Sequence, residues 1–352
     1  MHFSVNGRNI ETNFPVYIVA EMSANHGQDF NRAIDIIHAM KNAGADAVKI
    51  QTYTPDTMTI RSDSKLFKIS GGTVWDGQYL YDLYGKAYTP WEWQPKLKEE
   101  AEKTGLDFFS TAFDPTAVEF LEKMGVAVHK VASYEIVDIP LIEAMAKTGK
   151  PLIISTGMAT LEEVQEAVET ARKAGAKQIA LLKCTSLYPA PLDEMNLRTI
   201  PIIAEKFDLP VGLSDHTLDV TLPVAAVALG ACIVEKHFTL SREFDTPDSK
   251  FSLEPHEFAE MVRAVRAVEK ALGTVHFGPT EMEKSSRTKR RSLFVVGDIK
   301  KGEKFTEQNV KSIRPGHGLH TRHLHEVINQ TATEDIPKGT PLEWKHVAGE
   351  KG

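Results

Sequence analysis

The sequence predicts an α/β fold: a (β/α)8 TIM barrel followed by a small β-rich domain. Three observations predict this class. Short apolar runs alternate with amphipathic helical segments over the first three quarters of the chain, a glycine stands between most helices and the next run, and short β runs dominate from residue 292. A doubly wound open sheet is the alternative, but the glycine-rich phosphate-binding turn that follows its first strand is missing from this sequence.

Each apolar run has the length of a strand and lacks polar alternation, as expected where a parallel sheet is covered on both faces. The eight predicted strands are 16–20, 47–51, 107–110, 128–132, 151–155, 178–183, 210–213 and 231–236. Helices are expected between them, for example at 31–43, 116–124, 161–174 and 220–229, with a further helix at 255–272.

The interval between residues 51 and 107 is too long for one connection. It contains GGTVWDGQYLYDLYGKAYTPWEW, which holds three of the four tryptophans. We interpret this segment as an insert that lies over the mouth of the barrel. An ordinary hydrophobic brace beneath the loop is an equally good interpretation.

We expect three parts in the chain: a barrel domain (1–274), a linker (275–291) and a small β-rich domain (292–352). The linker loses hydrophobic periodicity and is rich in basic residues, a composition typical of a solvated tether. The last part has strand runs separated by Gly and Pro turns and is marginal in size for folding alone, so we expect it to dock on another surface.

The composition limits the possible partners. The 352 residues include 41 Lys plus Arg and 48 Asp plus Glu, a net charge of −7. This charge excludes a protein held to nucleic acid or to an anionic membrane by a bulk basic field. No apolar run spans a bilayer and the N-terminal residues lack the plan of a signal peptide, so we expect a cytoplasmic protein. Cys184 and Cys232 lie in apolar runs and are expected to be buried, reduced thiols.

In a barrel, functional groups gather at the carboxyl ends of the strands. Every predicted strand has polar residues there. They are Glu21, Ser23, Asn25 and His26; Lys49 and Gln51; Ser110 and Thr111; Lys130, Ser133 and Glu135; Ser155 and Thr156; Lys183, Thr185, Ser186 and Tyr188; Ser214, Asp215 and His216; Glu235, Lys236 and His237.

Lys49 and Lys130 are expected in or near the barrel interior, where an unpaired cation is costly, so an anionic ligand is the simplest explanation. A phosphate together with a carboxylate fits these lysines and the nearby hydroxyls. One alternative is that each lysine pairs with a buried Glu or Asp. A second is that one of them forms a Schiff base in an aldolase.

His216 and His237 end adjacent strands, so their imidazoles can reach one divalent ion. With oxygen groups such as Glu21 or Asp248 nearby, Mn²⁺ or Mg²⁺ is favoured over structural zinc, which takes four protein ligands. The tract HGLHTRHLH near the C-terminus holds four more histidines, and we expect there a loop and helix start with solvated rings.

Several motifs together resemble the sialic-acid synthase family along nearly the whole chain. They are VAEMSANHG, GADAVKIQTYTPDTMT, FFSTAFD, KVASYE, IISTGMAT, LLKCTSLYP, VGLSDHT and ALGACIVEKHFTL, and the tail VVGDIKKGEKFTEQNVKSIRPGHG is similar to the antifreeze-like SAF domain, a β-clip. The resemblance implies an enzyme that condenses phosphoenolpyruvate with an open-chain amino sugar. It also implies a divalent metal, Mn²⁺ or Mg²⁺ with Co²⁺ as a substitute, and a domain-swapped homodimer.

Within that family, AEMSANH, KIQTYTPDT and the tryptophan-rich insert are most similar to the pseudaminate branch, whose members use 2,4-diacetamido-2,4,6-trideoxy-L-altrose. Neuraminate, legionaminate and spore-coat polysaccharide branches remain alternatives, because spore-coat synthases share much of this pattern. A non-catalytic sugar-binding protein is a further alternative, suggested by the tail.

The resemblance also implies roles for individual residues. Phosphoenolpyruvate would be held by Lys49, Thr111, Lys130, Ser133, Ser155 and Ser214. The metal would be bound by His216 and His237, and Glu21 would be the acid–base carboxylate. Glu135, Tyr188 and Asp248 would contact the sugar, together with Arg314 from a partner subunit. Gln51 and Lys183 complete the substrate-binding candidates because of their strand-end positions.

Overall fold

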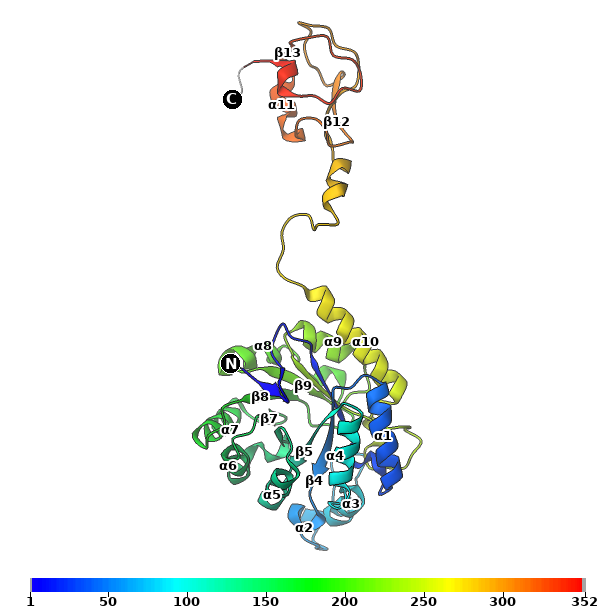
Figure 1. Ribbon diagram of the computed structural model, residues 1–352, viewed down its shortest axis with the longest axis vertical. Helices are drawn as coiled ribbons and strands as arrows, with labels where there is room; N and C mark the ends of the chain where they lie inside the picture. The colour runs from blue at the N-terminus through cyan, green and yellow to red at the C-terminus, as the bar shows by residue number, and fades with distance from the viewer. Residues whose placement is uncertain (1, 350–352) are drawn as a thin grey trace. The chain divides into compact units, whose positions relative to one another are not determined.

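The computed structural model describes residues 2–349 (Figure 1). Two compact units divide the chain, Met1–Gly273 and Thr274–Gly352. The outer ends of the two expected domains, residues 1 and 350–352, lie outside the described residues. The expected linker falls in the second unit and contains the short helix η6 (Lys284–Lys289); its role as a tether stays a prediction.

The first unit is a closed barrel of eight parallel strands, so the predicted (β/α)8 class is confirmed. Around the barrel the order is β10-β3-β4-β5-β6-β7-β8-β9. The strands are β3 (Tyr17–Glu21), β4 (Ala47–Thr52), β5 (Asp107–Ala112), β6 (His129–Val131), β7 (Leu152–Ser155), β8 (Ile179–Cys184), β9 (Val211–Asp215) and β10 (Ile233–His237).

Helices surround these strands (Figure 1). Local sequence signals start several of them: the Asp29 and Asp114 carboxylates cap α1 and α5, and Thr160 and Glu163 form a capping box at α7. The helices are α1 (Phe30–Asn42), α4 (Gln94–Lys103), α5 (Pro115–Met124), α6 (Ile139–Lys147), α7 (Leu161–Lys173), α8 (Thr199–Phe207), α9 (Thr221–Ala228) and α10 (Pro255–Leu272).

Alternate residues of each strand face opposite sides of the barrel wall. On β3, Tyr17 and Val19 belong to the core inside the barrel, whereas Ile18 and Ala20 pack with the core between barrel and helices. This period of two continues to the end of each strand. It therefore decides which of the polar residues at the strand ends can enter the interior.

The N-terminal hairpin of β1 (Ser4–Val5) and β2 (Arg8–Asn9) covers the amino ends of the strands. Phe3, Val5 and Ile10 are fully buried in the interior core. Asn6 donates to Asp107 at the start of β5 at 2.6 Å. The barrel is thus closed at this end, and an approach to the interior is left to the carboxyl ends.

The insert between β4 and α4 contains α2 (Pro55–Met58), η2 (Lys65–Phe67) and α3 (Leu80–Ala87). Two of its tryptophans act as braces. The Trp91 indole donates to the Tyr53 carbonyl at 3.0 Å, and the Trp93 ring packs edge-on against Phe30, with ring centroids 5.5 Å apart. The third, Trp75, lines a cavity, so both interpretations of the insert hold, each for different tryptophans.

The second unit is β-rich, as predicted, and has its own core around Leu293, Val295, Phe305 and Leu342. Its strands are β11 (Ser292–Val295), β12 (Val310–Ile313), β13 (Thr331–Ala332) and β14 (Val347–Ala348). The histidine tract forms η7 (Thr321–His323) and the start of α11 (Leu324–Val327), as expected. Three of its histidines are exposed: His317, His320 and His325.

Within residues 2–349, no helix combines the length and the apolar character that crossing a membrane requires.

Candidate active site

A layer of polar side chains lies inside the barrel at the carboxyl ends of its strands. All of its members are buried, and each lies on the face of the barrel wall opposite to the strand residues that pack against the helices. They are Glu21, Lys49, Thr111, Lys130, Ser155, Ser214, Glu235 and His237. The structure therefore brings together residues from seven of the eight strands, as the barrel rule predicts.

Lys49 is the centre of an ion-pair network. Its ammonium group is paired closely with the Glu21 carboxylate and lies 3.4 Å from the Glu235 carboxylate. It also donates to the Thr111 hydroxyl at 3.2 Å, and Ser214 donates to Glu235 at 3.2 Å. For Lys49 the alternative of pairing with buried carboxylates is thus what the structure shows.

Lys130 is different, although it is also fully buried. Its Nζ donates to the Val131 carbonyl at 2.9 Å and to the Ser155 hydroxyl at 2.7 Å. Among residues 2–349, no carboxylate lies within ion-pair distance of it. Burial lowers the pKa of Lys130, and the Glu235 charge only partly offsets this effect. A buried cation with neutral neighbours is a strong site for an anion.

Glu21 has the electrostatics of an acid–base group. Burial raises its pKa to about 7, against the lowering influence of Lys49. A carboxyl group with a pKa near neutrality can both accept and release a proton at physiological pH. Lys49 pairs with Oε2 of this carboxylate, and Oε1 accepts from the Ser23 backbone N–H at 2.8 Å, which fixes the orientation of the Glu21 side chain.

His216 and His237 lie side by side, with ring centroids 5.2 Å apart. The Nδ1 of His216 faces the Thr185 carbonyl at 3.0 Å, which leaves its Nε2 available. The Nδ1 of His237 is buried and has no hydrogen-bond partner in the described chain. Burial moves the pKa of His237 well below its usual value, so its ring is neutral, the form that binds metal ions.

A cavity of about 450 Å³ adjoins the polar layer. Four of the predicted substrate-binding residues line it together with His237: Gln51, Glu135, Tyr188 and Asp248. Burial raises the pKa of Glu135 to about 7, and its Oε2 is without a hydrogen-bond partner in the described chain. The volume suits a ligand the size of a sugar.

Ser133 lies beside this cavity, next to the loop after β7. Its hydroxyl accepts from the Gly157 backbone N–H at 3.2 Å. A Cβ atom at Gly157 would stand 2.6 Å from that hydroxyl and 2.2 Å from the Ser186 hydroxyl. Only glycine fits there, and it brings a backbone N–H and two hydroxyls together.

Two predicted site residues are not brought to the interior. Lys183 has the parity of Ile179 and Leu181, which pack against the helices, and it donates to the Cys184 carbonyl at 2.7 Å. Arg314 is exposed in the second unit. Their substrate-binding roles stay predictions.

Other strand-end residues have structural partners. The Asn25 amide donates to the Phe238 carbonyl at 3.0 Å, and His26 faces the Thr89 hydroxyl at 3.1 Å. Lys236 is paired closely with Asp215 on the outer side of the wall, where both are buried.

Sequence reasoning gave no role to Glu235, a member of the polar layer, or to Cys184, which ends β8 on the same inner face of the barrel wall. The Cys184 thiol is free and buried, as expected. Burial opposes its ionisation, yet His216, 3.9 Å away, lowers its pKa to about 7. The signal that was missed is the alternation of side chains along a strand. Glu235 and His237 alternate with Lys236, so the three cannot all face the same side of the barrel wall.

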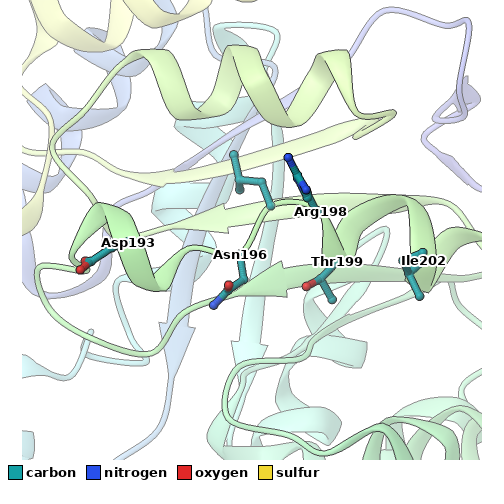
Figure 2. A pocket seen from close by; sticks show the side chains of 6 residues that line it. Asp193, Asn196, Arg198, Thr199 and Ile202 are labelled. Atoms are coloured by element: carbon teal, nitrogen blue, oxygen red, sulfur yellow. The ribbon is translucent and has the colours of Figure 1, made fainter.

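A second hollow, of about 510 Å³, lies at the connection between β8 and α8. Figure 2 shows its lining residues, Asp193, Asn196, Leu197, Arg198, Thr199 and Ile202. The labelled side chains fan out and do not converge on one point. None of the predicted site residues lines it, so the barrel mouth is the candidate site.

Comparison with known proteins agrees with this geometry. Residues 36–277 match the NeuB family and residues 290–348 match the SAF domain. The chain belongs to the NeuB family. The predicted resemblance to sialic-acid synthases with a C-terminal SAF domain is therefore confirmed.

Two curated relatives are pseudaminic acid synthases. The one from Campylobacter jejuni is 45% identical over 95% of this chain and 97% of its own length. The one from Helicobacter pylori is 46% identical over 93% of this chain and 96% of its own length. Among solved structures, the N-acetylneuraminic acid synthetase of Leptospira borgpetersenii superposes with a TM-score of 0.73 at 32% identity, covering 81% of this chain and 95% of that one.

Proposed function

We propose that this NeuB-family enzyme is a pseudaminic acid synthase. It would condense phosphoenolpyruvate with 2,4-diacetamido-2,4,6-trideoxy-L-altrose and water, and release pseudaminic acid and phosphate. The sequence identity of 45–46% to two enzymes of that name supports the choice of sugar. Lys130 is the observation that supports the anionic substrate, because it is 1% exposed and, among residues 2–349, its partners are a hydroxyl and a carbonyl only.

The buried layer would hold phosphoenolpyruvate. Lys130 and Lys49 would bind its phosphate and carboxylate, with donors from Thr111, Ser155 and Ser214. Ser133 would add a further hydroxyl from the loop beside Gly157. These groups are held in place before substrate arrives, so they would stabilise charge that collects on the leaving phosphate at little cost in reorganisation.

The donor set at His216 and His237 fits a divalent cation. Two imidazoles converge there, and in the described chain the buried Nδ1 of His237 has no hydrogen-bond partner; Asp248 supplies an oxygen group near the same cavity. In the described part of the chain no three His, Cys, Asp or Glu side chains form a complete metal cage, so substrate or water would supply the remaining ligands. When bound, Mn²⁺ or Mg²⁺, or Co²⁺ in their place, would polarise the sugar aldehyde as a Lewis acid.

Glu21 would be the general acid–base group that transfers protons. In this reaction C3 of phosphoenolpyruvate bonds to the aldehyde carbon, water adds at C2, and the C2–O bond to phosphate breaks. Glu21 lies against Lys49, beside the expected phosphate, and would take the proton from the water that attacks C2. Gln51, Glu135, Tyr188 and Asp248, which line the cavity, would orient the sugar.

Phosphate release tests the proposal. The enzyme should release phosphate from phosphoenolpyruvate with the altrose derivative, faster than with N-acetylmannosamine or the legionaminate precursor, and chelator should abolish release. In H₂¹⁸O the label should appear in the ketose. Label in the phosphate would contradict the C–O cleavage, and a preference for another amino sugar would assign the enzyme to another nonulosonate branch.

A Schiff-base aldolase is the competing mechanism, since the lowered pKa of Lys130 would also suit an amine nucleophile. Borohydride in the presence of substrate would then attach the substrate covalently to Lys130, and chelator would have no effect. A synthase should show neither result.

We also propose a domain-swapped dimer, in which Arg314 of one subunit serves the barrel of its partner. Loops at the barrel mouth expose apolar side chains, among them Val137 and Met158, that a second copy could cover. Mixing the inactive variants Arg314→Ala and Lys130→Met tests this, because a swapped heterodimer contains one intact site and regains activity. No recovery after subunit exchange would place Arg314 in its own chain's site. The cytoplasmic location stays a prediction from the sequence.

A further inference from the structure

One wall of the 450 Å³ cavity is apolar and comes from the insert. Strand-end loops supply the charged groups of the cavity, and the insert adds the hydroxyl-bearing Tyr53, Thr73 and Tyr84 beside six apolar side chains. We call these residues the insert wall: Met58, Ile69, Trp75, Leu80, Leu83 and Ala87.

Trp75 is presented to the cavity by a small hairpin, residues 68–79. Lys68 and Tyr79 form an antiparallel bridge, and the Ile69 N–H donates to the Gln78 carbonyl at 2.9 Å. At the tip, the Asp76 carboxylate accepts from the backbone N–H of Gly72 at 2.8 Å. Gly72 has a φ of 87°, a conformation that favours glycine. The hairpin is therefore held by its own hydrogen bonds.

The insert wall offers no free donor at Trp75. The indole N–H is already bonded to the Pro247 carbonyl at 2.8 Å. The Trp75 ring packs against Tyr188 and Phe251, with centroid distances of 5.4 and 5.9 Å. Pro247 precedes Asp248, so this one bond ties the insert to the loop that carries a proposed sugar contact.

A ligand hydroxyl placed against these six side chains, out of reach of the Tyr53, Thr73 and Tyr84 hydroxyls, would lose water without gaining a partner, whereas a methyl group would lose nothing. We infer that Trp75 and the insert wall hold the 6-methyl group of a 6-deoxy amino sugar and discriminate against the 6-hydroxy sugar. The inference rests on the proposed function, and it assigns the choice between deoxy and hydroxylated substrates to the insert.

The test compares kcat/KM for the altrose derivative with kcat/KM for its 6-hydroxy analogue. Wild-type enzyme should prefer the 6-deoxy sugar by roughly 10- to 100-fold, the range that an apolar pocket achieves. Trp75→Ala should reduce the preference to a few-fold. Trp75→Phe, which keeps an aromatic face, should retain most of it.

Trp91→Phe is the matched control. It removes an indole hydrogen bond of 3.0 Å from the same insert, but Trp91 is not part of the cavity lining. The preference of the Trp91→Phe variant for the 6-deoxy sugar should equal that of wild type. If Trp75→Ala lowers kcat/KM equally for both sugars, Trp75 is a brace and the inference is wrong.

Ile69→Thr covers the case in which Trp75→Ala fails to fold. It keeps the β-branched shape and adds a hydroxyl to the insert wall, so it should favour the 6-hydroxy analogue several-fold relative to wild type. An unchanged ratio in this variant would also contradict the inference. Wild-type enzyme that releases phosphate with neither sugar would instead contradict the proposed function itself, together with the specificity built on it.

Discussion

The two ends of the barrel differ in how their charged groups are partnered. At the amino ends of the strands, Asp46 accepts from Arg8 at 2.6 Å, from Arg266 at 2.8 Å and from the Ile18 N–H at 2.9 Å. At the carboxyl ends, Lys130 has no carboxylate partner among residues 2–349. In the same part of the chain, the buried Nδ1 of His237 and the buried Oε2 of Glu135 have no hydrogen-bond partner.

This contrast separates stability from function. At the amino end the Asp46 carboxylate is satisfied by its own neighbours, as expected of a group that serves folding. The carboxyl end retains uncompensated groups that cost folding free energy, and such groups cluster where a ligand binds.

Lys130→Met should be the most damaging substitution for catalysis. Removing the buried cation should lower kcat/KM for phosphoenolpyruvate by about 1,000-fold, the scale for loss of a preorganised electrostatic group. Its free energy of unfolding should stay the same or rise, because Met fills the space without a charge. Steady-state kinetics and urea unfolding measure the two effects.

Lys236→Met is the control for Lys130→Met, since both lysines are buried in the same barrel. It would leave Asp215 buried and unpaired, which should cost about 3–5 kcal/mol of stability. A Lys130→Met variant that is destabilised as strongly as Lys236→Met would show that the contrast between them is wrong.

Glu135→Gln should stabilise the protein in a pH-dependent way. Because the folded-state pKa of Glu135 is raised to about 7, its favourable contribution is complete below about pH 4.5 and is lost as pH rises towards 7. The variant should therefore exceed wild type by up to about 3 kcal/mol at pH 8, and by little at pH 5.

Urea unfolding at the two pH values checks this difference. Glu122→Gln is the control, because ion pairing with Lys150 and His129 offsets burial and lowers the pKa of Glu122. It should bring no gain at pH 8. Equal stability of Glu135→Gln and wild type at pH 8 would remove Glu135 from the strained groups of the mouth.

Glu21→Gln should lower kcat by roughly 100-fold with little change in substrate binding. A base acts when deprotonated, so wild-type kcat/KM should rise with pH through the Glu21 pKa of about 7. The variant should lose that limb of the pH profile. A full rate, or the same limb in the variant, would assign the proton transfer to another group.

Asp46→Asn tests the amino end. Loss of its two ion pairs should cost about 2 kcal/mol of stability, while kcat and KM stay at wild-type values. A drop in kcat at a temperature where the variant is fully folded would show that this end also affects catalysis.

Much of the fold and site could be predicted. Unbroken apolar strands and capped helices are local signals, and they predicted the barrel; the rule that catalytic groups lie at strand ends then placed Glu21, Lys49, Lys130, His216 and His237 in one site. Lys183 shows where this reasoning stops. Lys183 lies at the end of a strand, but on the outer face of the barrel wall. A prediction that uses only the positions of strand ends, and not the alternation of side chains, cannot tell the inner face from the outer one.

Apolar periodicity, capping residues and ordered motifs are local features of the chain, and they were enough to predict the barrel, the family and the chemical types of group at its mouth. The partners of these groups were fixed only by folding: within residues 2–349 Lys49 has two carboxylate partners and Lys130 has none, and of the three tryptophans in the insert only Trp75 lines the cavity. The reason is that pairing and desolvation depend on side chains far apart in sequence, whose approach is fixed only when the barrel closes.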